Sequence, residues 1–167
     1  MEKIVECVPN FSEGSDPEVF KALSEAISSV PEVLLLDLDP DPSYNRVVVT
    51  FVGSPEAVVE AAFQATKVAG ERIDMRKHKG GHPRFGAIDV CPFVPVKGVN
   101  TSECAELARA YGKRVGAELN YPVYLYESAA STPARKNLAK VRSGEYEGLK
   151  DKIVKPEWRH DFGPAEF

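Results

Sequence analysis

The sequence has few of the residues that build disulfide or metal scaffolds. Its three cysteines, Cys7, Cys91 and Cys104, are widely spaced and form no C-x-x-C pair, and only three histidines are present. An odd, dispersed set of this kind argues against a disulfide framework or a zinc finger. Cys7 and Cys91 fall in apolar runs, so we expect them to be buried, reduced thiols.

Long hydrophobic runs and an excess of positive charge are also lacking. No apolar stretch approaches the ~20 residues that span a bilayer, and the N-terminus has no signal-peptide pattern. We therefore expect a cytoplasmic protein without a membrane partner. The formal net charge of −4 provides no general attraction for nucleic acid, so any anion must bind through local charge.

What is present is the composition of a globular domain. The chain has 167 residues, of which 43% are hydrophobic and 28% charged. This length can bury a sizeable core but is short for two independent domains, so one domain is expected.

Apolar periodicity and helix-capping residues predict a regular order of elements. Strands are predicted at 4–9, 33–39, 46–52, 88–96 and 122–126, and helices are predicted to begin at residues 15, 54 and 100. Pro92 and Pro95 each remove a ladder donor, so the strand that contains them should pair irregularly. This βαββαβ order favours an α+β ferredoxin-like sandwich, with a mainly antiparallel sheet and its helices on one face. The charged tail should form short helices near Leu138 and Leu149.

The segment Asp74–Asp89 between the second helix and the next strand concentrates basic residues and two of the three histidines. Charge alone is explained by a solvated loop, but Gly80 and Gly81 allow close backbone approach, and Pro83 restrains the residue before it. His82 is therefore a candidate acid–base residue, since imidazole titrates near neutral pH. A purely structural histidine remains the alternative.

Polar residues that follow the first and second strands are further candidates. Asp37 and Asp39 share one face of the second strand while Leu38 points away. A carboxylate such as Asp39 can orient a histidine or bind a protonated substrate nitrogen, and the group lacks the pattern of a calcium loop, so no metal site is expected. Asn10 and Ser12 are candidate ligand contacts, although such residues often only close turns.

Several motifs together resemble the formiminotransferase family. They comprise Val5–Gly14, Asp74–His78, Gly81–Phe93, Pro122–Tyr126, Arg142–Glu147 and Asp161–Pro164, and they occur in order over essentially the whole chain. The resemblance identifies the chain as the N-terminal subdomain of a formiminotransferase domain, covering 1–167. It implies that 128–167 is a wrapping tail that leads to a second subdomain absent from this chain, whose end at Phe167 looks like a cut.

The resemblance also implies an activity: transfer of the formimino group from N-formimino-L-glutamate to tetrahydrofolate, giving 5-formiminotetrahydrofolate and glutamate, in histidine degradation. His82 matches the catalytic histidine of the family, and the segment that begins at Gly163 and Pro164, followed by Ala165, Glu166 and Phe167, matches part of the folate site. Tetrahydrofolate would be a co-substrate, and no metal is implied. Lys79 and Arg84 could bind the carboxylates of the anionic substrates, because both are basic residues of the same loop.

Two other functions remain open, and the oligomeric state, with a homodimer as one possibility, is undetermined. In the formiminotransferase family the ligands lie in the groove between two subdomains, and a non-catalytic folate- or ligand-binding subdomain would use this groove without turnover. A nucleic-acid-binding module is disfavoured, because the total charge is negative and no aromatic residues alternate with the basic ones between Arg76 and Arg84.

Overall fold

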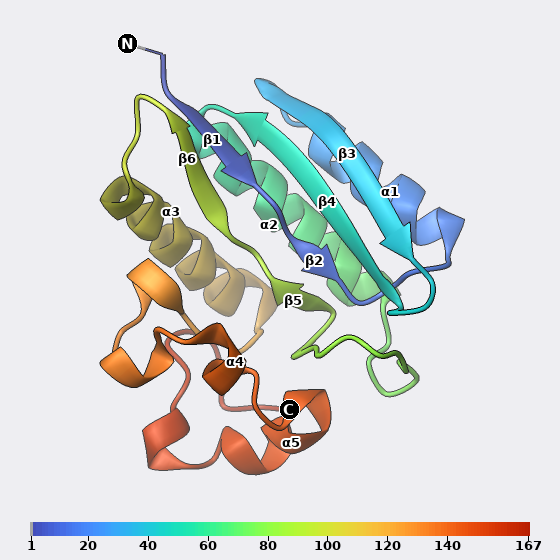
Figure 1. Ribbon diagram of the computed structural model, residues 1–167, viewed down its shortest axis with the longest axis vertical. Coiled ribbons are helices and arrows are strands. Elements are labelled where there is room, and N and C mark those ends of the chain that lie inside the picture. The colour runs from blue at the N-terminus through green and yellow to red at the C-terminus, as the bar shows by residue number, and fades with distance from the viewer. Residues whose placement is uncertain (1) are drawn as a thin grey trace.

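The central feature of the computed structural model, which describes residues 2–167, is an antiparallel sheet. Its strand order is β5-β2-β4-β1-β6, with β3 added beside β4 (Figure 1). The strands are β1 (Ile4–Cys7), β2 (Asn10–Phe11), β3 (Val33–Asp41), β4 (Arg46–Gly53), β5 (Ile88–Val90) and β6 (Phe93–Lys97).

The predicted strand 88–96 is interrupted. The predicted strand 4–9 ends at Cys7, and a further short strand follows at Asn10–Phe11, which the sequence placed after the strand. β4 pairs with both β1 and β2, while β6 pairs with β1 and β5 pairs with β2, so each pair of short strands runs as one broken strand across the sheet. Pro9 and Pro92 lie in the two breaks, where a residue without an amide hydrogen costs least. The irregular pairing predicted around Pro92 is therefore confirmed, and the sheet has the order β3, β4, β1/β2, β6/β5 of a ferredoxin-like fold.

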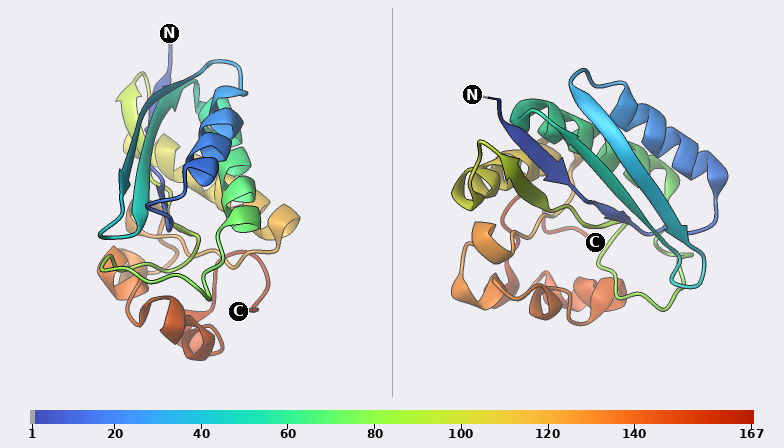
Figure 2. Two further views of the ribbon diagram at one scale, coloured as in Figure 1. Left: turned by 90° about the vertical axis from the view of Figure 1, so that its right-hand side faces the viewer. Right: turned by 45° about the horizontal axis from the view of Figure 1, so that its top comes forward.

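Three helices cover one face of this sheet, as the side view in Figure 2 shows. They are α1 (Pro17–Ser28), α2 (Pro55–Arg72) and α3 (Thr101–Arg114). Asp16 caps α1 by accepting from the Glu18 amide, and Asn100 and Glu103 form a reciprocal capping box at α3. A turn of π-helix, Val115–Leu119, follows α3 and ends at Asn120 in the left-handed conformation.

The core lies between the helices and the inner face of the sheet. Phe11, Leu23, Ile27 and Phe51 are its largest completely buried side chains, and they come from β2, α1 and β4. Cys7 is also buried there, with its sulfur 3.6 Å from that of Cys91. Strand β4 supplies every second side chain to this core, because side chains alternate between the two faces of a strand and Val47, Val49 and Phe51 point inward.

The opposite face of the sheet carries exposed apolar side chains. Leu34 and Leu36 of β3 are 62% and 53% exposed, and Val96 of β6 is 55% exposed. An antiparallel sheet whose outer face meets only water would alternate polar residues there. These side chains instead give the outer face the character of a contact surface.

The predicted strand 122–126 is wrong. Val123 forms only an isolated bridge with Phe162, and the Leu125 amide donates to the Asp161 carboxylate at 2.8 Å rather than to a neighbouring strand. Pro122 has no amide to donate at all. The segment is apolar because it lines a cavity and packs on the helices, which a strand pattern cannot distinguish from pairing in a sheet.

The tail that follows packs below the sheet and α3 as a set of short helices (Figure 1). Its α-helices are α4 (Leu138–Val141) and α5 (Glu145–Lys152), which confirms the two short helices predicted there. Buried charges hold it together: Arg135 pairs with Asp161 at 3.2 Å, and the Lys152 ammonium donates to the Val141 and Ser143 carbonyls. Between residues 2 and 167 no helix is long and apolar enough to cross a membrane.

Candidate active site

The loop between α2 and β5 is fixed on one side by the turn that joins β3 to β4. The Asn45 side chain donates to the Lys79 carbonyl at 2.8 Å, and His78 Nε2 lies 2.9 Å from the Asn45 carbonyl. Gly80 is required here, because a Cβ atom at this position would lie 2.4 Å from the Tyr44 carbonyl oxygen.

The same loop is fixed on its other side by the tail. The Tyr146 amide donates to the Arg84 carbonyl at 3.0 Å, and the Arg84 guanidinium forms a bidentate pair with Glu147. Arg142 pairs with Asp89, which is 2% exposed and also accepts from the Phe85 amide at 2.9 Å. The loop is thus enclosed between two parts of the chain that are about 100 residues apart, counting from Asn45 to Tyr146.

His82 lies between these two anchors. His82 is partly exposed, and its ring is nearly perpendicular to that of Tyr44, with the centroids 6.4 Å apart. Desolvation lowers the pKa of His82 from its usual value, the positive charges of Arg46 and Arg142 lower it further, and Asp89 partly offsets them. The lowered pKa favours the neutral imidazole at pH 7, which is the form that can accept a proton.

The acidic residues of β3 lie on the outer face of the sheet. Asp37 and Asp39 are exposed while Leu38 packs against the core, so the predicted alternation is confirmed despite a bulge between Leu35 and Asp37. Within residues 2–167 no hydrogen bond or ion pair joins Asp39 to His82, although β3 leads into the turn that contacts the histidine. Asp41 instead caps that turn by accepting from the Tyr44 amide at 3.2 Å.

The remaining predicted residues of the first strand and of the loop differ in their availability to a ligand. Ser12 is 3% exposed and donates to the Gly86 carbonyl at 2.7 Å, so it anchors the end of the loop. Asn10 is partly exposed and donates to the nearby Val8 carbonyl at 3.4 Å. Lys79 is exposed, and within the described chain its ammonium forms no ion pair. The buried Arg84 is already paired.

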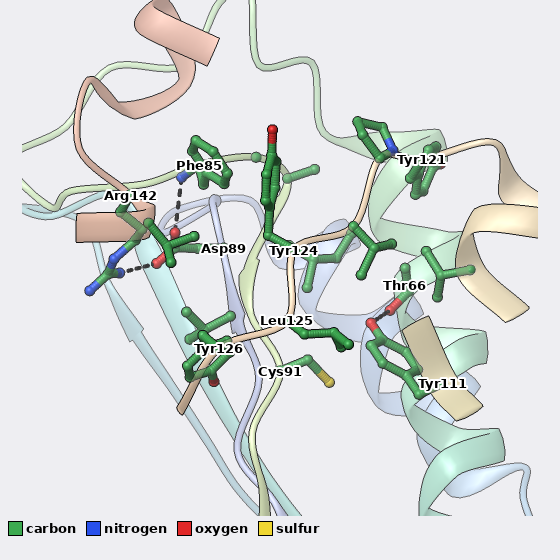
Figure 3. Close-up of a pocket in the computed structure, with 18 of the residues that line it drawn as sticks. Thr66, Phe85, Asp89, Cys91, Tyr111, Tyr121, Tyr124, Leu125, Tyr126 and Arg142 are labelled. Carbon is green, nitrogen blue, oxygen red and sulfur yellow. Dashed lines mark hydrogen bonds and ion pairs between the residues drawn. The ribbon is translucent and has the colours of Figure 1, made fainter. Parts of the chain in front are cut away.

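Beside the loop is a cavity of about 820 Å³. It lies between β5, the C-terminal end of α2, one side of α3 and the tail. Figure 3 shows Asp89 and Arg142 on one wall and the hydrogen-bonded pair Thr66 and Tyr111 on another. Its lining is mostly apolar and contains eight aromatic side chains: Phe85, Phe93, Tyr111, Tyr121, Tyr124, Tyr126, Tyr146 and Phe167. This volume and lining are typical of a small-molecule site.

The C-terminal segment reaches this cavity. Glu166 and Phe167 line it, and the ring of Phe167 lies 4.8 Å from that of Tyr146. Gly163 has φ +84°, and a Cβ atom there would lie 2.0 Å from the Tyr121 carbonyl oxygen, so only glycine fits. Pro164 and Ala165 connect this turn to the cavity.

Three charged residues of the site, Asp89, Arg142 and Glu147, were not among the candidates that the sequence suggested. In the sequence each of them looks like an ordinary surface charge. The ion pairs Arg142–Asp89 and Arg84–Glu147 each join residues more than 50 positions apart. Only the resemblance, through its Arg142–Glu147 motif, pointed to this part of the tail.

In this α+β chain, the loop that carries a partly exposed histidine also borders a cavity lined with aromatic residues. These are the features of a subdomain of a small-molecule enzyme. The family described as the formiminotransferase domain, N-terminal subdomain, matches residues 4–167, and the chain belongs to this family.

Relatives with curated names agree. The formimidoyltransferase-cyclodeaminase of Rattus norvegicus is 57% identical over 167 residues, which are 100% of this chain and 31% of the relative. The glutamate formimidoyltransferase of Streptococcus pyogenes serotype M1 is 50% identical over 167 residues, 100% of this chain and 56% of the relative, and that of Thermoplasma acidophilum is 51% identical over 164 residues, 97% and 54%. The chain thus spans about a third of the first relative and just over half of the other two.

Proposed function

We propose that this chain is one half of a glutamate formimidoyltransferase that transfers the formimino group of N-formimino-L-glutamate to tetrahydrofolate in histidine degradation in the cytoplasm. The observation that carries this proposal is the position of His82, a partly exposed imidazole in a loop anchored on both sides, in a chain that is 50% identical to a protein named glutamate formimidoyltransferase. Tetrahydrofolate is the co-substrate, and the proposed chemistry uses no metal.

The proposed chemistry needs one acid–base group. The folate nitrogen N5 attacks the formimino carbon and loses its proton as a tetrahedral centre forms. The bond from that carbon to the glutamate nitrogen then breaks, and this nitrogen gains a proton. A neutral imidazole can accept the first proton and return it in the second step. Asp39, on the strand that leads to the Tyr44 turn, is proposed to orient the histidine or the substrate nitrogen, and Asn10 to contact polar substrate groups.

N-formimino-L-glutamate and tetrahydrofolate both carry carboxylates, and folate also has an aromatic part. We infer that Lys79, an exposed ammonium three residues from His82, binds a carboxylate of the substrate. The aromatic part of folate is proposed to occupy the cavity, which Glu166 lines and in which Phe167 packs against the Tyr146 ring. Phe85 and Gly86, from the loop that carries His82, line this cavity together with Asp89 and Arg142, although His82 itself does not. We therefore propose that the histidine acts at the edge of the folate site.

The second half of the transferase unit is proposed to cover the outer face of the sheet. Leu34, Leu36 and Val96 give that face its apolar character. Burial of apolar surface stabilises an association by about 25 cal/mol per Å² before the costs of association. Without such a partner the same face favours self-association, including a homodimer.

The test compares formimino transfer by residues 1–167 alone with transfer after the second subdomain is added in trans. We expect the isolated chain to fold and to show little transfer, because positioning of both reactants contributes roughly 7–11 kcal/mol to such reactions. Addition of the second subdomain should restore turnover. Binding of folate without turnover in the complete unit would instead support a non-catalytic ligand-binding subdomain.

A further inference from the structure

The loop that carries His82 is joined to the first turn of α5 by the side chain of Arg84. This side chain is 8% exposed, and Nη1 and Nη2 donate to the two carboxylate oxygens of Glu147 at 2.9 and 2.5 Å. Its Nε atom donates to His78 Nδ1 at 3.0 Å. One guanidinium therefore connects both ends of the segment 78–84 to the tail.

The hydrogen-bonding capacity of Arg84 is largely used by these contacts. A guanidinium has five N–H groups, and Nη2 also donates to the His78 carbonyl at 3.4 Å, so four of the five have partners. To bind a substrate carboxylate in the bidentate manner that arginine favours, this side chain would have to give up Glu147. Arg84 is therefore poorly placed to act as a substrate ligand.

The backbone of the same residue is also held by α5. The Arg84 amide donates to Glu145 Oε1 at 3.3 Å, and its carbonyl accepts from the Tyr146 amide at 3.0 Å. Only Pro83 separates Arg84 from His82, and proline fixes its own φ and restricts the conformation of the preceding residue. Constraints on Arg84 are thus passed to the backbone of His82.

We propose that Arg84 and Glu147 are positioning residues that hold His82 in its reactive place by tying the loop to α5. This inference rests on the proposed transferase function. It replaces substrate binding as the role of Arg84 and adds Glu147, an exposed residue of the tail, to the residues on which turnover depends.

The kinetic test uses Glu147→Gln and the double variant Glu145→Gln/Glu147→Gln in the complete transferase unit, because Glu145 lies 3.8 Å from the guanidinium and retains part of the ion pair. Asp151→Asn is the matched control, since it makes the same change of charge on an exposed residue of the same helix. Both Glu147 variants should lower kcat about 10- to 100-fold, the loss expected from a misplaced reacting group, with KM within about twofold. The control should leave both constants unchanged.

Arg84→Lys distinguishes the two roles of the arginine. If Arg84 positions His82, this variant should lower kcat as Glu147→Gln does, and the effects of the two changes should not add, because both remove one contact. A raised KM for formiminoglutamate in Arg84→Lys, with normal kcat in Glu147→Gln, would overturn the proposal and return Arg84 to substrate binding.

Hydrogen exchange on residues 1–167 tests the tie itself, whatever reaction the protein catalyses. In the double variant the Phe85 and Tyr146 amides should exchange roughly tenfold to a hundredfold faster than in Asp151→Asn, as expected when charge-assisted hydrogen bonds are lost. Unchanged exchange would refute the proposal. Absence of transfer in the unmodified unit, together with faster exchange in the variant, would refute the transferase function and leave the tie in place.

Discussion

The ion pair between Asp89 and Arg142 allows a quantitative prediction about stability. The Asp89 side chain is 2% exposed and that of Arg142 is 20% exposed. Replacing Arg142 with methionine keeps most of its apolar volume and leaves a buried carboxylate without a cation. Loss of one partner of a buried pair costs about 3–5 kcal/mol, and the partial exposure of Arg142 places this case near 3 kcal/mol at pH 7. For a domain of this size that corresponds to a fall in Tm of roughly 6–12 °C.

The pH dependence of this loss follows from the sign of the Asp89 shift. Desolvation raises the pKa of Asp89 above 3.8, while Arg142 and the Phe85 amide lower it. The folded state therefore binds the proton more tightly than the unfolded state, so the contribution of Asp89 to stability declines as pH rises above about 4. Without Arg142 the folded pKa rises further, and the decline extends to higher pH. The deficit of Arg142→Met should accordingly be large at pH 7 and shrink to about 1 kcal/mol near pH 4, where a protonated acid needs no cation.

Urea unfolding of Arg142→Met and of the unmodified chain, at both pH values, provides the measurement. Asp89→Asn in the Arg142→Met background should recover more than half of the deficit at pH 7, because the neutral amide can still accept from the Phe85 amide. An equal deficit at pH 4 and pH 7, without recovery by the asparagine, would show that Arg142 stabilises through packing and that the reasoning from charge is wrong.

Three further predictions concern the site and the segment that leads to it. His82→Ala should lower turnover roughly 10²- to 10⁴-fold with folate affinity retained, and near-normal turnover would contradict its role. In the unmodified enzyme, kcat/KM should rise with pH through a pKa below 6.5 and be level at pH 7, because the neutral imidazole is the base. Lys79→Gln should raise KM for formiminoglutamate more than the control Lys77→Gln, because the Lys77 ammonium lies 3.7 Å from the Asp74 carboxylate. Equal effects of the two variants would show that Lys79 is only a solvated residue. Gly163→Ala should weaken folate binding measured by calorimetry, because φ +84° and the nearby Tyr121 carbonyl exclude a side chain at this position. The control Gly148→Ala should leave binding unchanged, because a Cβ atom there would have no neighbour within 4 Å.

Local chemistry in the sequence was enough to predict most of the fold. The capping residues Asp16 and Asn100 begin helices because their side chains accept from the first free amides, a property of a few neighbouring residues. Alternation likewise placed Asp37 and Asp39 on the face opposite Leu38, and Pro92 marked the break in pairing. The family also followed from motifs in the sequence.

Tertiary structure alone decided which charges meet. Whether Arg84 faces a ligand or Glu147 depends on how the tail packs, since these residues are 63 positions apart. The same holds for the segment 122–126, whose apolar residues would suit a strand equally well. In the structure they line a cavity, and the Leu125 amide donates to the Asp161 carboxylate instead of to a neighbouring strand. Contacts between distant segments depend on the packing of the whole chain, and a local pattern of residues carries no record of them.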